Sequence, residues 1–215
     1  MAETLRALRR GGVVLLPSET TYGLFADPTQ ALAVAKIFAL KQRPHDRTLP
    51  LIAGDAEQIR CFAKVDPFMP WASLFWPGPL TTIVELLGDA DARGLALRLL
   101  AQDGTVAVRV PRPEFLRRLC LEFGGPLTST SANLSGEAPA TKFATVAQNI
   151  RQGADLVWEC DAVCAGNAST LVRRLGAEME IVRQGILAPA VVRAVFRHAR
   201  AVDEARGLPK DRPST

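Results

Sequence analysis

Cysteine and histidine are scarce in this sequence of 215 residues, which has four of the first and two of the second. No two cysteines form a C-x-x-C pair, so their spacing indicates neither a zinc site nor a disulfide framework. The histidines are scattered and one lies near the end of the chain, which makes a Ser/His/Asp catalytic set implausible. We therefore expect no resident metal, and we expect the thiols to be buried and reduced, at Cys61, Cys120, Cys160 and Cys164.

Long apolar runs are absent as well. The longest, such as residues 13–16, fall far short of the roughly 20 residues that a membrane-spanning helix needs. Residues 1–12 have the pattern of a short amphipathic helix rather than that of a signal peptide. These features predict a cytoplasmic protein without a membrane partner.

Two nucleotide-binding fingerprints are missing, because the sequence contains neither G-x-x-x-x-G-K-[ST] nor G-x-G-x-x-G. A bound nucleotide would therefore use neither a P-loop nor a Rossmann fingerprint. Lysine is also rare, and it supplies five of the 26 basic residues, at positions 36, 41, 64, 142 and 210. A lysine inside a polar segment consequently stands out more than one of the many arginines.

The residues that are present predict an α/β fold. Hydrophobic residues make up 48% of the chain, enough for one buried core, and β-branched segments alternate with segments of helical periodicity. We expect strands at residues 13–16, 49–53, 80–86, 105–110, 127–129, 154–158, 169–173 and 179–183. We expect helices at residues 1–12, 29–40, 55–63, 67–75, 113–122, 144–152 and 189–199. Residues 1–200 are predicted to form one domain, and residues 201–215 a disordered tail.

Two polar segments interrupt the apolar pattern. Lys41-Gln42-Arg43-Pro44 ends a predicted helix and supplies two cations, whereas residues 129–136 follow an apolar run and are rich in hydroxyl groups. Together such groups could hold an anion such as a nucleotide phosphate. Two simpler interpretations stay open: a solvated cationic helix end for the first segment, and a helix cap or serine/threonine turn for the second.

Arg109 stands in a predicted strand between Val108 and Val110. A charge on a buried sheet face would be costly unless a carboxylate or a bound anion meets it, whereas on an exposed face it would cost nothing. Polar loops follow three predicted strands, at residues 18–23, 111–113 and 129–136. Because ligands of open α/β sheets lie beyond the carboxyl ends of strands, these loops could converge on one crevice.

Several segments, in this order and spacing, resemble the YrdC/TsaC family, the threonylcarbamoyl-AMP synthases of tRNA modification. Residues 17–24 are similar to the family's PTETVYGL segment, and Lys41-x-Arg43 and Ser131-x-Asn133 match its KxR and SxN signature. Further similar blocks lie at residues 77–81, 106–111, 168–172 and 182–185, so the resemblance covers about residues 5–196. The sequence departs from the family pattern at Ser18, Ala168 and Arg173.

The resemblance implies an enzyme that joins L-threonine, bicarbonate and ATP into threonylcarbamoyl-adenylate and pyrophosphate. It also implies a twisted mixed sheet flanked by helices, with a large electropositive concave groove. Carried over by position, Thr20 and Arg109 would bind threonine. The residues that would bind ATP are Lys41, Arg43, Thr105, Ser129, Ser131, Asn133 and Arg183, and the catalytic ones among them would be Lys41, Arg43, Ser131 and Asn133.

The same resemblance implies magnesium as the companion of ATP. It also implies tRNA or double-stranded RNA, and a downstream threonylcarbamoyl transferase complex, as partners. One alternative is a non-catalytic RNA-binding paralogue of the same fold, which a net charge of +4 and a pI near 9.1 support only mildly. Another is the related domain of hydrogenase maturation proteins, which act on carbamoyl phosphate. The paired KxR and SxN segments favour the synthase, since RNA binding needs only diffuse cations.

Overall fold

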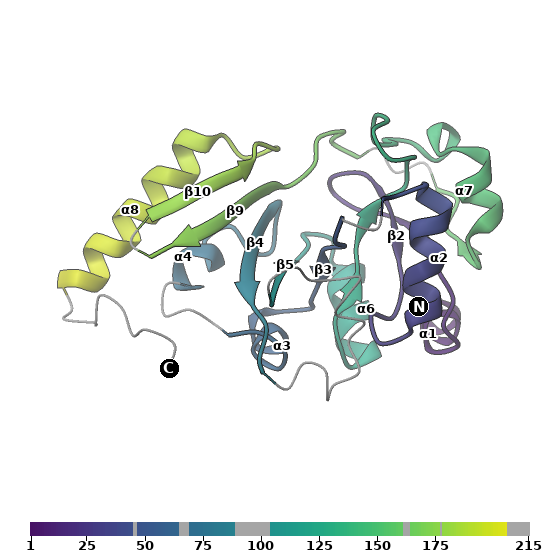
Figure 1. The fold of residues 1–215 in the computed structure, drawn as a ribbon, viewed down its shortest axis with the longest axis horizontal. Helices are drawn as coiled ribbons and strands as arrows, with labels where there is room; N and C mark the ends of the chain where they lie inside the picture. The colour runs from purple at the N-terminus through teal and green to yellow at the C-terminus, as the bar shows by residue number, and fades with distance from the viewer. Residues whose placement is uncertain (45–46, 65–68, 89–103, 161–163, 177, 206–215) are drawn as a thin grey trace.

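The chain folds into two β-sheets with helices packed around them (Figure 1). The structure is a computed structural model that describes residues 1–44, 47–64, 69–88, 104–160, 164–176 and 178–205. Within these residues one sheet has four strands and the other has six, and both contain parallel and antiparallel pairs. The predicted α/β class is confirmed, but the single sheet expected from the sequence is divided into two.

The smaller sheet is built around two short apolar strands that pair antiparallel and are buried throughout. Its two outer strands are only two residues long; one pairs parallel with the first inner strand, and the other pairs antiparallel with the second. In the order in which they lie side by side, the four strands are β7 (Thr130–Ser131), β2 (Tyr22–Phe25), β1 (Val14–Pro17) and β8 (Leu156–Val157).

The larger sheet has an antiparallel pair at its centre, and each strand of that pair has a parallel neighbour on its other side. From one edge to the other, its strands are β10 (Glu178–Arg183), β9 (Thr170–Leu175), β4 (Leu80–Glu85), β5 (Thr105–Arg109), β3 (Leu51–Ile52) and β6 (Leu127–Thr128). The chain crosses from β6 in this sheet to β7 in the smaller sheet with only Ser129 between them.

The helices of the described residues are α1 (Ala2–Arg9), α2 (Ala31–Lys41), α3 (Ala56–Arg60), α4 (Met69–Ser73), α6 (Glu114–Phe123), α7 (Gln148–Gly153) and α8 (Pro189–Ala205), with a 3₁₀ turn η1 (Phe143–Thr145). Two of them end in a left-handed residue, which releases the chain from the helix. These residues are Gln42 after α2, with φ of 48°, and Gly124 after α6, with φ of 91°. In the described part of the chain, no helix combines the length and the apolar character that crossing a membrane requires.

Both faces of β1 are covered by hydrophobic side chains. Val13 and Leu15 belong to the larger cluster, which includes residues of α2, whereas Val14 and Leu16 belong to a smaller cluster with residues of α1 and α6. Successive side chains of a strand point to opposite faces, so this alternation places β1 between two packed layers. The polar loop that follows β1 is therefore held at a fixed place at the end of the strand.

Two parts of the smaller sheet and its surroundings differ from the sequence-based prediction. Residues 18–23 were expected to be a loop, but β2 begins within them at Tyr22. Gly23 weakens the sequence pattern of this strand, and the space beside it is tight, because a Cβ atom would lie 3.0 Å from the ring of Phe25. The helix expected at residues 144–152 is divided into η1 and α7.

The C-terminal boundary and two thiols also differ from the prediction. Residues 201–205, assigned to a disordered tail, continue α8, where Arg200 pairs with Glu204 one turn later at 2.8 Å. The tail prediction is wrong for these residues, and residues 206–215 lie outside the described part. All four cysteines are free, as expected, but Cys61 and Cys160 are exposed rather than buried.

Candidate active site

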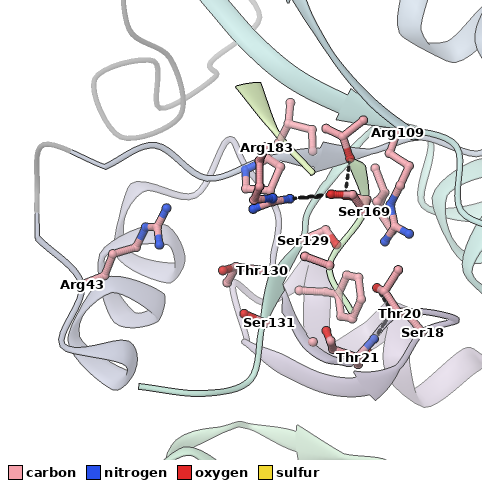
Figure 2. Close-up of a pocket in the computed structure, with 17 residues that line it drawn as sticks. Ser18, Thr20, Thr21, Arg43, Arg109, Ser129, Thr130, Ser131, Ser169 and Arg183 are labelled. Atoms are coloured by element: carbon pink, nitrogen blue, oxygen red, sulfur yellow. Dashed lines mark hydrogen bonds between the residues drawn. The ribbon is translucent and has the colours of Figure 1, made fainter. Parts of the chain in front are cut away.

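An open cavity lies where residues of the two sheets meet (Figure 2). Its walls come from the loop between β1 and β2, the crossing between β6 and β7, and the ends of β5 and β10. None of the described residues that line it carries a carboxylate, so its polar lining consists of hydroxyl, guanidinium and backbone groups. The polar lining residues are Ser18, Thr20, Thr21, Arg43, Thr81, Arg109, Ser129, Thr130, Ser131, Ser169 and Arg183.

Ser18 organises the loop between β1 and β2. Its Oγ donates to the main-chain oxygen of Thr21 at 2.7 Å and accepts from the main-chain N–H groups of Thr20 and Thr21, both at 3.2 Å. It also lies 2.9 Å from Oγ1 of Thr20. These contacts use only a hydroxyl group, so serine serves at this position in place of the family's threonine. The loop brings Thr20 to the cavity wall, where the resemblance places a threonine-binding residue.

Ser129 and Ser131 line the cavity from the crossing between the sheets. The main-chain N–H of Ser129 donates to Pro50, next to the larger sheet, at 2.8 Å. Three residues later, the main-chain N–H of Ala132 donates to Tyr22 of the smaller sheet, also at 2.8 Å. The backbone is therefore extended and fixed to both sheets, and the alternative of a helix cap does not hold for this stretch.

Lys41, at the end of α2, points toward the serine-rich segment. Its Nζ donates to the main-chain oxygen of Asn133 at 2.7 Å and to that of Ser131, and the N–H of Ser135 donates back to its main-chain oxygen at 2.9 Å. Lys41 is only 2% exposed, and burial, with the nearby charge of Arg43, lowers its pKa to about 8. A solvated helix end is thus excluded for Lys41, whose ammonium group binds the backbone behind the cavity wall.

Arg43 takes a different direction from Lys41. The left-handed conformation of Gln42 turns the chain between them, and Arg43 comes to line the cavity while Lys41 does not. The Nη2 of Arg43 donates to the main-chain oxygen of Thr48 at 2.6 Å, which anchors the guanidinium, and Figure 2 shows Arg43 apart from Arg109 and Arg183. Of the two cations of the KxR segment, Lys41 therefore binds the backbone behind the cavity, whereas Arg43 lines the cavity itself.

Asn133 also lies behind the cavity wall. Its Nδ2 donates to the main-chain oxygen atoms of Leu134 and Glu137, at 2.9 and 2.8 Å, and so closes the turn that follows β7. Its Oδ1 is buried, and no described residue donates a hydrogen bond to it. The Asn133 amide group therefore holds the shape of this loop through Nδ2, whereas its Oδ1 makes no hydrogen bond with the described residues.

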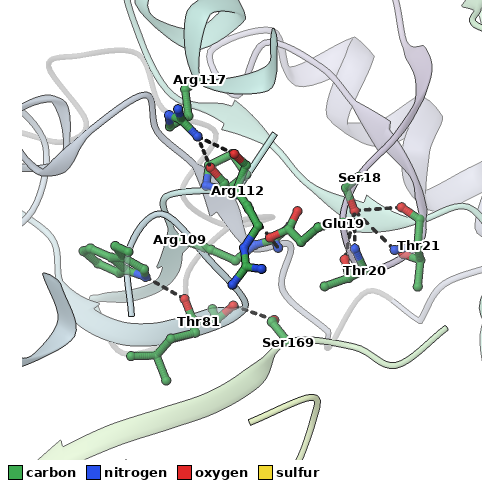
Figure 3. Close-up of polar contacts among 12 residues, drawn as sticks. Ser18, Glu19, Thr20, Thr21, Thr81, Arg109, Arg112, Arg117 and Ser169 are labelled. Atoms are coloured by element: carbon green, nitrogen blue, oxygen red, sulfur yellow. Dashed lines mark hydrogen bonds and ion pairs between the residues drawn. The ribbon is translucent and has the colours of Figure 1, made fainter. Parts of the chain in front are cut away.

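Arg109, at the end of β5, forms a buried ion pair with Glu19 from the loop after β1 (Figure 3). The Nη1 and Oε1 atoms are 2.5 Å apart, and the side chains are 7% and 13% exposed. Burial lowers the pKa of Arg109, and the charge and hydrogen bond of Glu19 oppose this effect. The strand pattern predicted a carboxylate or an anion at Arg109, but it did not identify Glu19, whose only sequence signal is its place in the PSETTYGL segment.

Arg183 and Ser169 form another part of the wall (Figure 2). The Nη2 of Arg183 donates to the main-chain oxygen of Ser169 at 3.0 Å, and the Oγ of Ser169 lies 2.6 Å from the Oγ1 of Thr81. Partial burial and the positive charge of Arg109 both lower the pKa of Arg183. Ser169 and Thr81 were not predicted as site residues, although both belong to blocks of the resemblance.

Thr105 does not join this group. It pairs with Glu85 at the start of β5, at the opposite end of the strand from Arg109, and it is absent from the cavity lining. Of the residues predicted for the site, the cavity lining includes Thr20, Arg43, Arg109, Ser129, Ser131 and Arg183. Lys41 and Asn133 stand directly behind it.

The sequence is similar to a known family and to several known proteins. The family Sua5_yciO_yrdC, described as "Telomere recombination", matches residues 6–185. The threonylcarbamoyl-AMP synthase of Vibrio vulnificus (strain YJ016) is 39% identical over 158 residues, which are 69% of this chain and 77% of the relative. That of Idiomarina loihiensis is 34% identical over 183 residues, 81% of this chain and 95% of the relative.

Two solved structures share the fold. The crystal structure of P. abyssi Sua5 complexed with L-threonine has a TM-score of 0.81 and 29% sequence identity. The similarity covers 90% of this chain and 56% of that one, so this chain spans little more than half the length of that protein. E. coli YciO has a TM-score of 0.76 at 21% identity, covering 86% of this chain and 89% of the other, and supports the fold alone.

Proposed function

This chain belongs to the Sua5/YciO/YrdC family, and on that premise we propose that it is a threonylcarbamoyl-AMP synthase. The reaction joins L-threonine, bicarbonate and ATP into threonylcarbamoyl-adenylate and pyrophosphate, and it supplies the activated group for threonylcarbamoyladenosine modification of tRNA. One observation carries the proposal: three arginines and a set of hydroxyl groups line one cavity in which no described lining residue is acidic.

The charges of the reactants match that cavity. The threonine amine attacks bicarbonate to give a carbamate with loss of water, and a carbamate oxygen then attacks the α-phosphorus of ATP as pyrophosphate leaves. Threonine carboxylate, carbamate and triphosphate are all anions, so the protein has to hold them together against their mutual repulsion. Fixed guanidinium and hydroxyl groups do this without rearranging during the reaction, and holding the reactants together lowers the entropic part of the barrier.

The positions of the arginines support an assignment of the two ends of the cavity. Arg109 and Thr20 would bind the carboxylate and hydroxyl of threonine at the end near the β1–β2 loop. Arg43, which Figure 2 shows on the other side of the crossing segment from Thr20, would bind the phosphates together with Arg183. The carbamate would then lie between the two ends, next to the α-phosphate.

Lys41 and Asn133 would act through the loop that they hold. Lys41 binds the main-chain oxygen of Ser131, so it would fix the position of the Ser131 hydroxyl relative to the phosphates. This role differs from direct phosphate binding, which the resemblance implied for Lys41. Thr105 lies away from the cavity, and we propose no contact between Thr105 and ATP.

Magnesium would arrive with the nucleotide. The described residues include no group of three or more acidic, histidine or cysteine side chains that could hold a metal ion. The donor set of the cavity therefore fits an ion bound mainly by phosphate oxygens and water, with hydroxyl groups as additional ligands. Bound in this way, magnesium would neutralise part of the charge on the triphosphate.

The partners of the reaction are part of the same proposal. ATP, threonine and bicarbonate would be the substrates, and the adenylate would pass to a threonylcarbamoyl transferase complex that modifies tRNA in the cytoplasm. A non-catalytic RNA-binding role is less well supported, because Arg109 is nearly buried and neutralised by Glu19, whereas RNA binding calls for exposed cations.

Pyrophosphate release tests the proposal. Purified protein is incubated with ATP, magnesium and bicarbonate in three mixtures. The first contains L-threonine, the second contains L-serine, and the third contains no amino acid. We expect release that depends on threonine, with serine a poor substitute, and a product whose mass equals that of threonylcarbamoyl-adenylate. Equal release in all three mixtures would contradict the assignment, and RNA binding without any release would favour the paralogue.

A further inference from the structure

Glu19 stands behind the cavity rather than in it. It is not among the lining residues, although Ser18 and Thr20 on either side of it are. Its Oε1 holds the Nη1 of Arg109 at 2.5 Å and also accepts from the main-chain N–H of Arg112 at 3.3 Å. Its main-chain oxygen accepts from Ala165 at 3.1 Å. Glu19 thus joins the β1–β2 loop to the end of β5 from the protein side (Figure 3).

The direction of this contact fixes Arg109. A guanidinium has five N–H donors in one plane, and a contact to Nη1 from behind leaves the other donors for the cavity. Arg109 lines the cavity while its Nη1 is held by Glu19. Without the carboxylate, the guanidinium would be buried with neither a fixed orientation nor a counter-charge.

Charge gives Glu19 a second effect. Arg109 and Arg183 both line the cavity, and the positive charge of Arg109 lowers the pKa of Arg183. The Glu19 carboxylate cancels much of the field of Arg109, whereas Arg183 is held by neutral oxygen atoms of Ser169. The two arginines therefore differ in the net charge that each presents to the cavity together with its partner.

We propose that Glu19 is a positioning residue that makes the Arg109 end of the cavity selective for an amino-acid carboxylate over a phosphate. The inference rests on the proposed function and assigns the two substrates their places. A neutral Glu19–Arg109 pair offers directed hydrogen bonds to a single carboxylate but attracts a polyanion only weakly. Arg183 keeps its full charge for the triphosphate, so each substrate has one end that suits it better.

The test uses Glu19→Gln, which keeps the length of the side chain and removes its charge. We measure pyrophosphate release while threonine or ATP is varied, and we use inorganic tripolyphosphate as a probe for misplaced phosphate binding. The KM for threonine is expected to rise about tenfold or more while the KM for ATP changes by about twofold at most. Tripolyphosphate is expected to compete with threonine in this variant and not in the wild-type enzyme.

Glu19→Asp separates charge from contact, because aspartate keeps the charge but is one methylene shorter. We expect Glu19→Asp to raise the KM for threonine with little competition from tripolyphosphate. Glu85→Gln is the matched control, since Glu85 forms an ion pair with Lys64 at 3.0 Å on the surface, with the two side chains 56% and 48% exposed. Circular dichroism and thermal unfolding of all variants report whether each one folds.

The outcomes are distinct. A wild-type protein without threonine-dependent release contradicts the proposed function, whatever the variants do. With an active wild type, a Glu19→Gln variant that matches Glu85→Gln in KM and in tripolyphosphate inhibition overturns the inference. Loss of stability with equal changes in both KM values also overturns it, because Glu19 would then be only structural. If Glu19→Gln does not fold, strong tripolyphosphate competition in Glu19→Asp overturns the charge argument.

Discussion

The Nζ of Lys41 and the main-chain oxygen of Asn133 are joined by a hydrogen bond of 2.7 Å that spans 92 residues of sequence. The main-chain oxygen of Ser131 is the second acceptor. The lysine of the KxR segment therefore holds the backbone of the SxN segment, and the two segments form one structural unit. The arginine of the first segment and the serine of the second remain at the cavity wall.

The two cations of the KxR segment should respond differently to removal. Lys41→Ala removes the donor from one buried and one partly buried main-chain oxygen atom, and we expect it to lower the free energy of unfolding by about 2–3 kcal/mol and to reduce kcat. Arg43→Ala should change the free energy of unfolding by about 1 kcal/mol at most and act mainly by raising the KM for ATP. Urea unfolding and steady-state kinetics check both. Equal loss of stability in the two variants would contradict this division.

The lowered pKa of Lys41 gives a pH signature. The pKa is about 8 in the folded protein against an ordinary value of 10.5, so between these values the unfolded chain binds more protons. The contribution of this group to the free energy of unfolding is therefore full above 10.5 and is lost as the pH falls to about 8. We expect the free energy of unfolding of the wild type to rise relative to that of Lys41→Met by up to about 1.4 kcal/mol per pH unit between pH 8 and pH 10.5. Urea unfolding at several pH values measures this difference. A difference that stays constant or falls as the pH rises would contradict the prediction.

Ser18 is expected to tolerate threonine but not alanine. Alanine removes the hydroxyl that bonds Thr20 and Thr21, and we expect the free energy of unfolding to fall by about 1–3 kcal/mol. The KM for threonine should rise as well, because the loop carries Thr20. Ser18→Thr keeps the hydroxyl and serves as the control. Thermal unfolding and kinetics of the two variants measure the difference, and similar values for both would remove this role from Ser18.

Gly185 touches the backbone near Ser169 closely. A Cβ atom at Gly185 would lie 2.2 Å from the main-chain oxygen of Ala168 and 2.4 Å from the carbonyl carbon of Ser169. We expect Gly185→Ala to displace this segment, to destabilise the protein by about 1–3 kcal/mol and to weaken ATP binding. Gly125→Ala is the control, since its Cβ would meet nothing closer than Phe123 at 4.0 Å. Calorimetric binding of a non-hydrolysable ATP analogue would show whether the two variants differ.

The strands and helices with strong local patterns could be predicted from the sequence. β1 is an apolar run between breakers, β4 is rich in β-branched residues, and α2 ends before Pro44 as expected. β2 and β7 could not be predicted in the same way. Gly23 interrupts the pattern of β2, and β7 consists of Thr130 and Ser131, which become a strand only because β2 lies beside them. Their structure depends on contacts between distant parts of the chain rather than on local propensity.

The site could be predicted in part for the same reason. The resemblance identified the arginines and serines that line the cavity, and the strand around Arg109 indicated the need for a counter-charge. It could not identify Glu19, because any of several carboxylates could have met Arg109 before the two sheets were packed. It also could not tell that Lys41 and Arg43 take different directions, since that depends on the conformation of Gln42 between them. The binding roles of the lining residues remain predictions.

The passage of the chain between the two sheets through Ser129 alone has a consequence for substrate size. With one residue to span the junction, and its N–H bonded to Pro50, the sheets have no slack with which to spread apart. With this short connection, a bulkier amino acid would fit only if smaller side chains lined the cavity, because the two sheets cannot move apart. Enzymes of this architecture that accept larger substrates should therefore carry either smaller side chains around the cavity or a longer connection at this point.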